Sequence, residues 1–228
     1  MEGQKTVPFT GRGLIIGFRD CAMVRDVIGK SGWMLSALFC FCTPVFAQPQ
    51  QPPPAQLVET GQIVVAGHST PYLIRHLPVS SFPDLPAAVV ELLNRRGCVI
   101  PQTYEAHRPE NVVHASLERA GSSDWAVLCL AQGTVSLLVF FDSSSSQPLV
   151  LASAPETERL QAHDSTGVLG FNWGIDPASP AQVHEAQSGL ERRPPLVDHD
   201  ALADSMADRR TIYHFYVKNA WTVLEMPV

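Results

Sequence analysis

The sequence lacks the local signatures of the common enzyme classes. It has no Gly-x-Ser-x-Gly nucleophile elbow, no His-Glu-x-x-His zinc motif, no calcium-binding loop and no phosphate-binding loop of the Gly-x-x-x-x-Gly-Lys type. Aspartate, histidine and serine are all present, but no local pattern joins them into a catalytic triad. The sequence therefore offers no positive argument for an enzyme, and we expect no cofactor.

Basic residues are also scarce. Lysine and arginine number 16 against 22 aspartates and glutamates, so the formal net charge is −6. This balance argues against nucleic acid or an anionic membrane surface as the partner, because both repel an acidic chain. Hydrophobic residues make up 45% and charged residues 17% of the chain, so its composition does not predict disorder. The length allows one domain, or at most two small ones.

An uncharged apolar run lies near the start of the chain. Residues 34–42 (Met-Leu-Ser-Ala-Leu-Phe-Cys-Phe-Cys) follow Arg25 and Lys30, and Val45-Phe46-Ala47 comes shortly after them. A basic head, an apolar middle and small residues at the end indicate an export signal that is cleaved after Ala47. A membrane-spanning helix needs about 20 apolar residues. We therefore expect no stable membrane span after cleavage, and a periplasmic or secreted bacterial protein.

The extent of this leader depends on the start residue. From Met1 to Ala47 it exceeds the usual range of about 15–30 residues, whereas from Met23 it falls within that range. We therefore interpret residues 1–22 as a spurious or dispensable extension and 23–47 as the signal peptide, and the choice between the two starts stays open. A buried core helix is the alternative, but it does not explain the Pro/Gln-rich tract that follows. We expect that tract, residues 48–59, to be a linker before one domain at 60–228.

Two of the five cysteines remain after cleavage, Cys98 and Cys129. An even pair in an oxidising compartment predicts one disulfide. Closing a loop of about 30 residues would stabilise the fold by roughly 3–4 kcal/mol in the chain-entropy model. Two separate buried thiols are the alternative. A cysteine metal site is disfavoured, because the sequence contains no Cys-x-x-Cys.

Apolar patterning predicts an α+β fold. The strongest expected strands are residues 111–118, 124–131 and 135–141, of which the last two are apolar on both faces, as in the centre of a sheet. The expected helices are residues 84–96, residues 198–210, and two that begin at the capping boxes of Ser153 and Ser179. The chain ends in a hairpin over residues 212–226. Eight or nine strands with three or four helices indicate a single domain with a mainly antiparallel sheet and helices packed on it.

A polar loop before the strongest strands is one candidate binding site. It contains Glu105, His107, Arg108 and Glu110. Loops that enter a rigid sheet often carry binding residues, although a charged loop without a function is the simpler interpretation.

Asp198 and His199 form a second candidate. A histidine beside carboxylates can bind a metal ion or act as a base. The alternative is structural, because Asp198 can cap the expected helix and the acidic residues after it suit its first turn.

Tyr213 and Trp221 are the aromatic candidates. If the terminal hairpin lies at a sheet edge, one of its faces could present an aromatic binding surface. The alternative is that one face belongs to the core and the other is merely amphipathic.

Two resemblances add to this description. Val112 to Phe140 resembles one FG-GAP repeat of the integrin-type propeller, with an apolar strand, a Gly121-x-x-Asp124 turn, Trp125 and a strand after Gly133. Further copies and the alternating calcium-binding aspartates are missing from the sequence, so we do not expect a propeller. More broadly, the chain resembles small exported bacterial proteins of no assigned function. The segments that carry this resemblance are Cys98–Gln102, Glu105–Val112, Asp124–Cys129 and the final aromatic hairpin. It implies one domain in a bacterial envelope or secreted setting, with no catalytic residues to transfer.

The leading hypothesis is an exported, non-catalytic binding domain of the bacterial cell envelope. Its partner would be an unknown envelope protein or a small ligand, and an acidic domain suits a basic partner such as a cationic lytic enzyme. The alternative is a metal-dependent or His/Asp-based hydrolase built from Asp198, His199 and the Glu105–Glu110 loop. That alternative requires the two segments to converge in one concave pocket.

Overall fold

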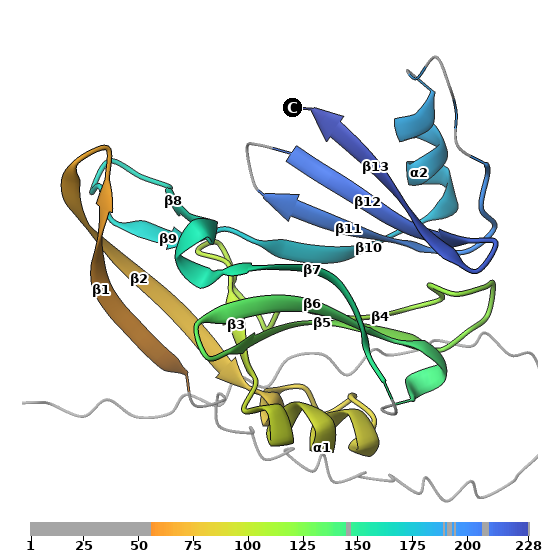
Figure 1. Ribbon diagram of the computed structural model, residues 1–228, viewed down its shortest axis with the longest axis horizontal. Coiled ribbons are helices and arrows are strands. Elements are labelled where there is room, and N and C mark those ends of the chain that lie inside the picture. Colours follow the sequence, from red (N-terminus) through yellow and green to blue (C-terminus); the bar gives the residue numbers. More distant parts are fainter. Residues whose placement is uncertain are drawn as a thin grey trace, which may run out of the picture. The chain divides into compact units, whose positions relative to one another are not determined.

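The computed structural model describes residues 56–144, 147–188, 190, 193, 195–206 and 210–227 (Figure 1). The expected extension, the signal peptide with its cleavage site at Ala47, and most of the Pro/Gln-rich linker lie outside these residues. The first strand already begins at Leu57, within the segment that the sequence assigned to the linker. Residues 207–209 of the expected helix 198–210 also lie outside the described part.

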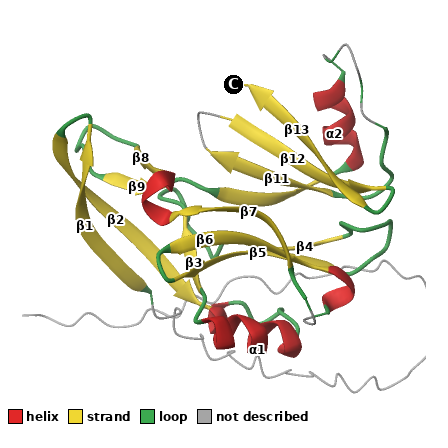
Figure 2. Cartoon of the chain, in the orientation of Figure 1, coloured by secondary structure: helices red, strands yellow, loops and turns green. Residues whose placement is uncertain are grey.

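Two β-sheets make up most of the described chain (Figure 2). The larger sheet contains β1 (Leu57–Val65), β2 (His68–Pro78), β3 (Val99–Gln102), β4 (Val112–Ala115), β5 (Asp124–Ala131), β6 (Thr134–Phe140), β7 (Leu149–Pro155), β8 (Leu160–Ala162) and β9 (Leu169–Phe171). Its strand order is β7-β6-β5-β3-β2-β9-β8, with β1 beside β2 and β4 beside β5. The smaller sheet runs in order through β10 (Gly174–Ala178), β11 (Ala201–Met206), β12 (Arg210–Val217) and β13 (Ala220–Pro227).

The expected α+β fold with three or four helices is wrong. The described residues contain two α-helices, α1 (Ala87–Arg96) and α2 (Pro180–Gln187), and three short 3-10 turns at 79–81, 141–143 and 156–159. The described part of the chain is therefore mainly β, and the helices cover two small parts of it.

The expected helix 198–210 is wrong, because residues 201–206 form a strand. The spacing of its acidic residues fits a strand as well as a helix. Asp200 and Asp204 lie four residues apart, which fits one face of a helix but equally fits one face of a strand. In the structure, residues 201–206 form β11, and Asp204 is buried between the sheets. Its Oδ1 accepts a hydrogen bond of 2.6 Å from Trp173 Nε1, and its Oδ2 lies 3.2 Å from His214 Nε2.

The capping box at Ser153 does not start a helix either. Ser153 lies inside β7 opposite Ser136 of β6, and the two hydroxyl oxygens are 3.0 Å apart. The sheet partner supplies hydrogen bonds to this segment, so its backbone does not need helical ones. After Pro155 the chain makes only the 3-10 turn over residues 156–159.

Several other predicted elements are confirmed. Strand β5 occupies the predicted residues 124–131, and β12 and β13 form the predicted terminal hairpin. Helix α2 begins at the capping box of Ser179 and Gln182. Helix α1 begins at Ala87 rather than Asp84 and ends at Arg96, and the Gly97 that caps it has a φ of 69°, the left-handed conformation that favours glycine.

The apolar faces of β5 explain how the layers pack. Ala126, Leu128 and Leu130 join a cluster that also includes Leu202 of β11, so this face packs toward the smaller sheet. On the opposite face, Trp125, Val127 and Cys129 pack against apolar side chains of α1. A third cluster joins α2 to the outer face of the smaller sheet. The order of layers is therefore α1, larger sheet, smaller sheet, α2 (Figure 1).

The predicted disulfide between Cys98 and Cys129 is present. It links the start of β3 to β5, with 5.1 Å between the two Cα atoms, and both residues are buried beneath α1. In the described part of the chain, no helix is both long and apolar enough to cross a membrane.

Candidate functional site

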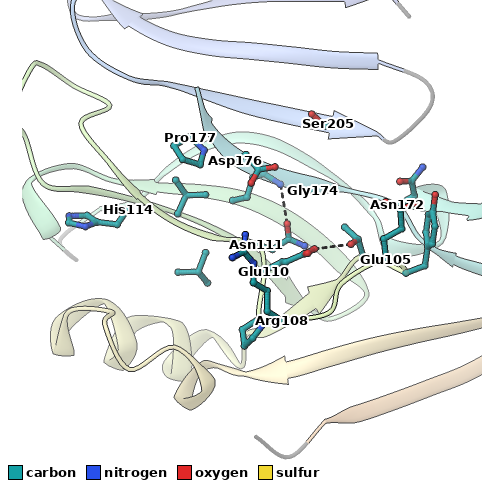
Figure 3. Close-up of a pocket in the computed structure, with 16 residues that line it drawn as sticks. Glu105, Arg108, Glu110, Asn111, His114, Asn172, Gly174, Asp176, Pro177 and Ser205 are labelled. Carbon is teal, nitrogen blue, oxygen red and sulfur yellow. Dashed lines mark hydrogen bonds between the residues drawn. The ribbon is translucent and has the colours of Figure 1, made fainter. Parts of the chain in front are cut away.

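A cavity of about 560 Å³ lies between the two sheets at the end of β3 (Figure 3). One wall is the loop 103–111, which connects β3 to β4 in the larger sheet. The other wall is β10 of the smaller sheet, with Gly174, Asp176 and Pro177. We call this cavity the acidic groove, because it carries Glu105, Glu110 and Asp176.

The Gln102 side chain connects the two ends of the loop 103–111 by hydrogen bonds to the backbone of Glu110. This side chain is only 4% exposed, and its Oε1 accepts a hydrogen bond of 2.9 Å from the backbone N–H of Glu110. Its Nε2 donates to the Glu110 carbonyl oxygen at 3.1 Å. In addition, Thr103 Oγ1 donates to Glu110 Oε2 at 2.8 Å. The two ends of the loop are thus held together from inside, which organises the wall before any ligand arrives.

Arg75 of β2 connects the same loop to the larger sheet. Its Nη2 donates to the carbonyl oxygens of Thr103 at 2.8 Å and of Tyr104 at 3.2 Å. The Tyr104 ring in turn stacks on His163, with 4.4 Å between ring centroids. The loop therefore has fixed contacts with the larger sheet, although several of its side chains are exposed.

Asn111 fixes the distance between the two walls. It is 2% exposed and has a left-handed φ of 68°. Its Nδ2 donates to the carbonyl oxygens of Pro101 and Trp173, and its Oδ1 accepts a hydrogen bond of 3.0 Å from the N–H of Ile175 in β10. One buried side chain thus connects β3, the end of the loop and β10.

The charges in the acidic groove are unbalanced. Its described lining contains three carboxylates, Glu105, Glu110 and Asp176, and one guanidinium, that of Arg108. Glu105, Arg108 and Asp176 are exposed, and none of them has an ion-pair partner within 4.0 Å among the described residues. In Figure 3, Asp176 lies on one side of the cavity, and Arg108 and Glu110 lie on the other. A cationic group placed between them would meet carboxylates from both walls.

A second cavity, lined in part by aromatic rings, adjoins the acidic groove. Its volume is about 550 Å³, and it shares Pro109, Val112 and His114 with the groove. His114 is exposed and stacks on Trp125, with 4.4 Å between centroids and 13° between ring planes. Phe82 also lines this second cavity. The groove thus offers carboxylates, and the second cavity offers aromatic rings together with the carboxylate of Asp84.

The structure separates the residues that the sequence singled out. Glu105, Arg108 and Glu110 line the acidic groove, whereas His107 lines a smaller cavity behind the same loop. Asp198 and His199 line another cavity of about 530 Å³ beside Tyr216. The loop and the Asp198–His199 segment therefore do not converge in one pocket, as the hydrolase alternative requires.

His199 and its neighbours have structural partners. His199 is buried, and its Nε2 lies 2.9 Å from the Tyr216 carbonyl oxygen, while its Nδ1 lies 3.2 Å from Asp198 Oδ1. Asp200 exchanges backbone and side-chain hydrogen bonds with Ser116, just after β4. Because both imidazole nitrogens of His199 already have partners, a metal ion at either nitrogen would have to displace one of them.

Tyr213 and Trp221 take part in packing. Tyr213 packs on the cluster beneath α2, and Trp221 packs on the cluster between the sheets. The ring of Trp221 lies 5.9 Å from that of Phe141 and 5.4 Å from that of Tyr216, measured between centroids. The two aromatic candidates thus lie on opposite faces of the hairpin and do not form one binding surface.

The second wall of the groove was not predicted from the sequence. Asp176 lies in β10, more than 60 residues after the loop in sequence, as the Asn111–Ile175 contact also shows. No local motif marks it, and only the pairing of the two sheets brings it to the loop.

Comparison with known proteins finds no family model, no curated protein and no solved structure that matches this chain. The resemblance to one FG-GAP repeat and to small exported bacterial proteins therefore stays a prediction.

Proposed function

We propose that the protein is a non-catalytic binding domain that acts outside the bacterial cytoplasm and holds a cationic group in the acidic groove. The observation that carries this proposal is the set of exposed carboxylates, Glu105 and Asp176, on two walls that are joined by Asn111. The backbones of both walls are already held in place, so a cation would bind without ordering them, and carboxylates outnumber the one guanidinium in the lining. A small amine and a basic segment of an envelope protein share this chemistry.

The neighbouring aromatic cavity extends the expected ligand. Phe82 offers apolar surface, and His114 an aromatic ring, directly beside the carboxylates. A ligand with a cationic group next to an apolar group would use both parts. Exposed ion pairs contribute only about 0.2–1 kcal/mol each. A short peptide is therefore expected to bind weakly, with a Kd on the order of 1 mM.

NMR titration tests this proposal with two peptides that differ only in charge. We expect acetyl-Lys-Phe-Lys-amide to shift the backbone amide resonances of the residues other than proline in 103–111 and 174–177, and acetyl-Glu-Phe-Glu-amide to leave them unchanged. The double variant Glu105→Gln/Asp176→Asn should bind the lysine peptide at least fivefold more weakly, because it removes one carboxylate from each wall. Titration with spermidine separates a small amine from a peptide as the preferred ligand.

A matched variant controls for net charge. Glu185→Gln/Asp198→Asn also removes two exposed carboxylates, but neither residue lines the acidic groove. This variant should bind the lysine peptide as the parent protein does. Equal weakening in both double variants, or equal binding of both peptides, would show that the groove is not the site.

The proposed location has its own support and its own test. The predicted export signal, which ends at Ala47, favours passage across a membrane, and a disulfide is typical of oxidising compartments. Amino-terminal sequencing of the protein from a bacterial envelope fraction should read from Gln48. Recovery of the uncleaved chain from the cytoplasm would contradict this part of the proposal.

A further inference from the structure

A second cluster of ionisable side chains lies away from the acidic groove, on β1, β2 and the 3-10 turn 156–159. It consists of Glu59, His76 and Glu156, and one nitrogen or oxygen from each lies within 4.8 Å of the other two. Elsewhere in the described residues, no three His, Cys, Asp or Glu side chains bring their ligand atoms this close.

Two of the three residues are buried without a permanent positive charge nearby. His76 is 4% exposed and Glu156 is 6% exposed, and His76 Nε2 lies 2.7 Å from Glu156 Oε1. In the described structure, neither Glu59 nor Glu156 has a lysine or arginine within 4.0 Å. Two charged carboxylates this close repel each other, and a cation bound between them would relieve that repulsion.

The third residue of the cluster, Glu59, is exposed but has a fixed hydrogen-bond partner. The hydroxyl group of Tyr72 donates a hydrogen bond of 3.1 Å to Glu59 Oε1. Tyr72 lies opposite Gly61 in the β1–β2 pair, and its ring lies across that glycine. A Cβ atom at residue 61 would come within 2.5 Å of the Tyr72 hydroxyl oxygen.

Gly61 therefore leaves the space that the Tyr72 ring occupies. Glycine is unfavourable in a strand interior and often marks a close approach of another group. Here the missing side chain lets the Tyr72 ring lie flat over β1 and direct its hydroxyl group to Glu59. This arrangement places the Glu59 carboxylate beside the buried carboxylate of Glu156. An ion pair between His76 and Glu156 alone does not require a second carboxylate there.

We propose that Glu59, His76 and Glu156 bind one divalent transition-metal ion, and that Tyr72 positions Glu59 for it. One imidazole nitrogen and two carboxylate oxygens match the donor sets of Zn²⁺, Mn²⁺ and Fe²⁺ rather than those of Ca²⁺ or Mg²⁺, which prefer oxygen ligands alone. Zn²⁺ holds such ligands at about 2.0–2.2 Å, so the exposed Glu59 would move inward on binding. Three protein ligands would leave a coordination position for water.

Calorimetric titration of the chelator-treated protein with ZnCl₂ tests the site. Eight histidines in the chain could bind Zn²⁺ weakly, so variants must identify the strong site. We expect one strong site in the parent protein and a loss of at least tenfold in its affinity in Glu59→Gln. His76→Gln should lose the site as well, and Glu59→Gln keeps the test decisive if the buried variant does not fold.

Helix α2 supplies matched controls for both substitutions. His184→Gln and Glu185→Gln change exposed residues of the same types outside the cluster, and they should keep the parent affinity. CaCl₂ should give no strong site. Equal Zn²⁺ affinity in the parent, Glu59→Gln and His76→Gln would overturn the proposal, as would a parent protein with no strong site.

The positioning role of Tyr72 has a separate readout. Tyr72→Phe removes only the hydroxyl group, so the melting temperature of the metal-free protein should change little while the Zn²⁺ affinity falls about threefold or more. Gly61→Ala should displace the Tyr72 ring and weaken Zn²⁺ binding although residue 61 has no ligand atom. If both variants bind Zn²⁺ like the parent, Tyr72 does not position Glu59.

Discussion

Asn111 donates a hydrogen bond from Nδ2 to the carbonyl oxygen of Trp173 at 3.1 Å, and this bond crosses from the larger sheet to the start of the smaller one. The Asn111 Oδ1 accepts a hydrogen bond from the backbone N–H of Ile175 in β10, and its Nδ2 also donates to the carbonyl oxygen of Pro101 in β3. One buried side-chain amide therefore forms hydrogen bonds with three backbone groups, those of Pro101, Trp173 and Ile175. We infer that Asn111 is the main polar link between the sheets at this end.

Asn111→Ala should destabilise the protein strongly. It leaves the backbone groups of Pro101, Trp173 and Ile175 without this partner, and a buried unsatisfied group costs about 1–3 kcal/mol. We expect the free energy of unfolding in urea to fall by about 3 kcal/mol in total, measured by circular dichroism. Asn219→Ala is the control, because Asn219 also has a positive φ, of 61°, but lies exposed in the β12–β13 turn. An equal loss in both variants would mean that backbone conformation, not the amide contacts, explains the effect.

Gln102 should control the mobility of the acidic groove. Gln102→Met keeps the side-chain length but removes both hydrogen bonds to the backbone of Glu110. We expect amide hydrogen exchange at Glu110 to become about tenfold faster, as the loss of roughly 1.4 kcal/mol of local protection implies. Gln62→Met, on the exposed face of β1, should leave that rate unchanged. An unaltered rate in Gln102→Met would show that other contacts, such as those of Arg75, suffice.

The disulfide should contribute a large part of the stability. Cys98 and Cys129 are 31 residues apart, and closing a loop of that size stabilises the fold by about 3–4 kcal/mol in the chain-entropy model. The double variant Cys98→Ala/Cys129→Ala should lose about this amount in urea unfolding. Adding a reductant should destabilise the parent protein but not the double variant. An unfolding curve of the parent that does not respond to complete reduction would contradict this account.

The elements that were predicted correctly are those whose structure is determined by interactions among residues close together in the sequence. Strands β5 and β6 are mostly apolar on both faces and lie between two packed layers, and the Ser179 capping box supplies its own hydrogen bonds at the start of α2. The residues that misled the prediction have partners far away in sequence. Ser153 pairs with β6, and the Asp204 carboxylate pairs with Trp173 and His214.

The candidate site could be predicted only in part for the same reason. The charged loop with Glu105 and Arg108 stands out in the sequence, because polar residues interrupt two apolar strands there. Asp176 on the second wall and the Glu59–His76–Glu156 cluster carry no local signal. Glu59 and Glu156 come close only because β1 pairs with β2 and the turn after β7 packs over that pair.

The loop after β8 contains a carboxylate whose titration can be followed directly. Asp164 Oδ1 accepts hydrogen bonds from Thr166, at 2.5 Å from Oγ1 and at 2.9 Å from the backbone N–H. These bonds favour the charged form, the side-chain bond more than the backbone one, and they lower the pKa of Asp164 below its usual value. Because the folded-state pKa is lower than the unfolded one, the contribution to stability is present at neutral pH and is lost as the pH falls through the folded-state pKa.

Thr166→Val should therefore raise the pKa of Asp164, because it removes the larger of the two causes and keeps the backbone bond. Carbon-13 NMR of the carboxyl group over the acidic range measures the midpoint in both proteins. We expect the parent midpoint to lie below the usual aspartate value of about 3.9, and the variant midpoint to move toward it. Thr70→Val makes the same chemical change in β2, where the hydroxyl group donates to the His68 carbonyl oxygen instead, and should leave the Asp164 midpoint in place. If Thr166→Val and the parent titrate together, the hydroxyl group does not stabilise the charged carboxylate in solution.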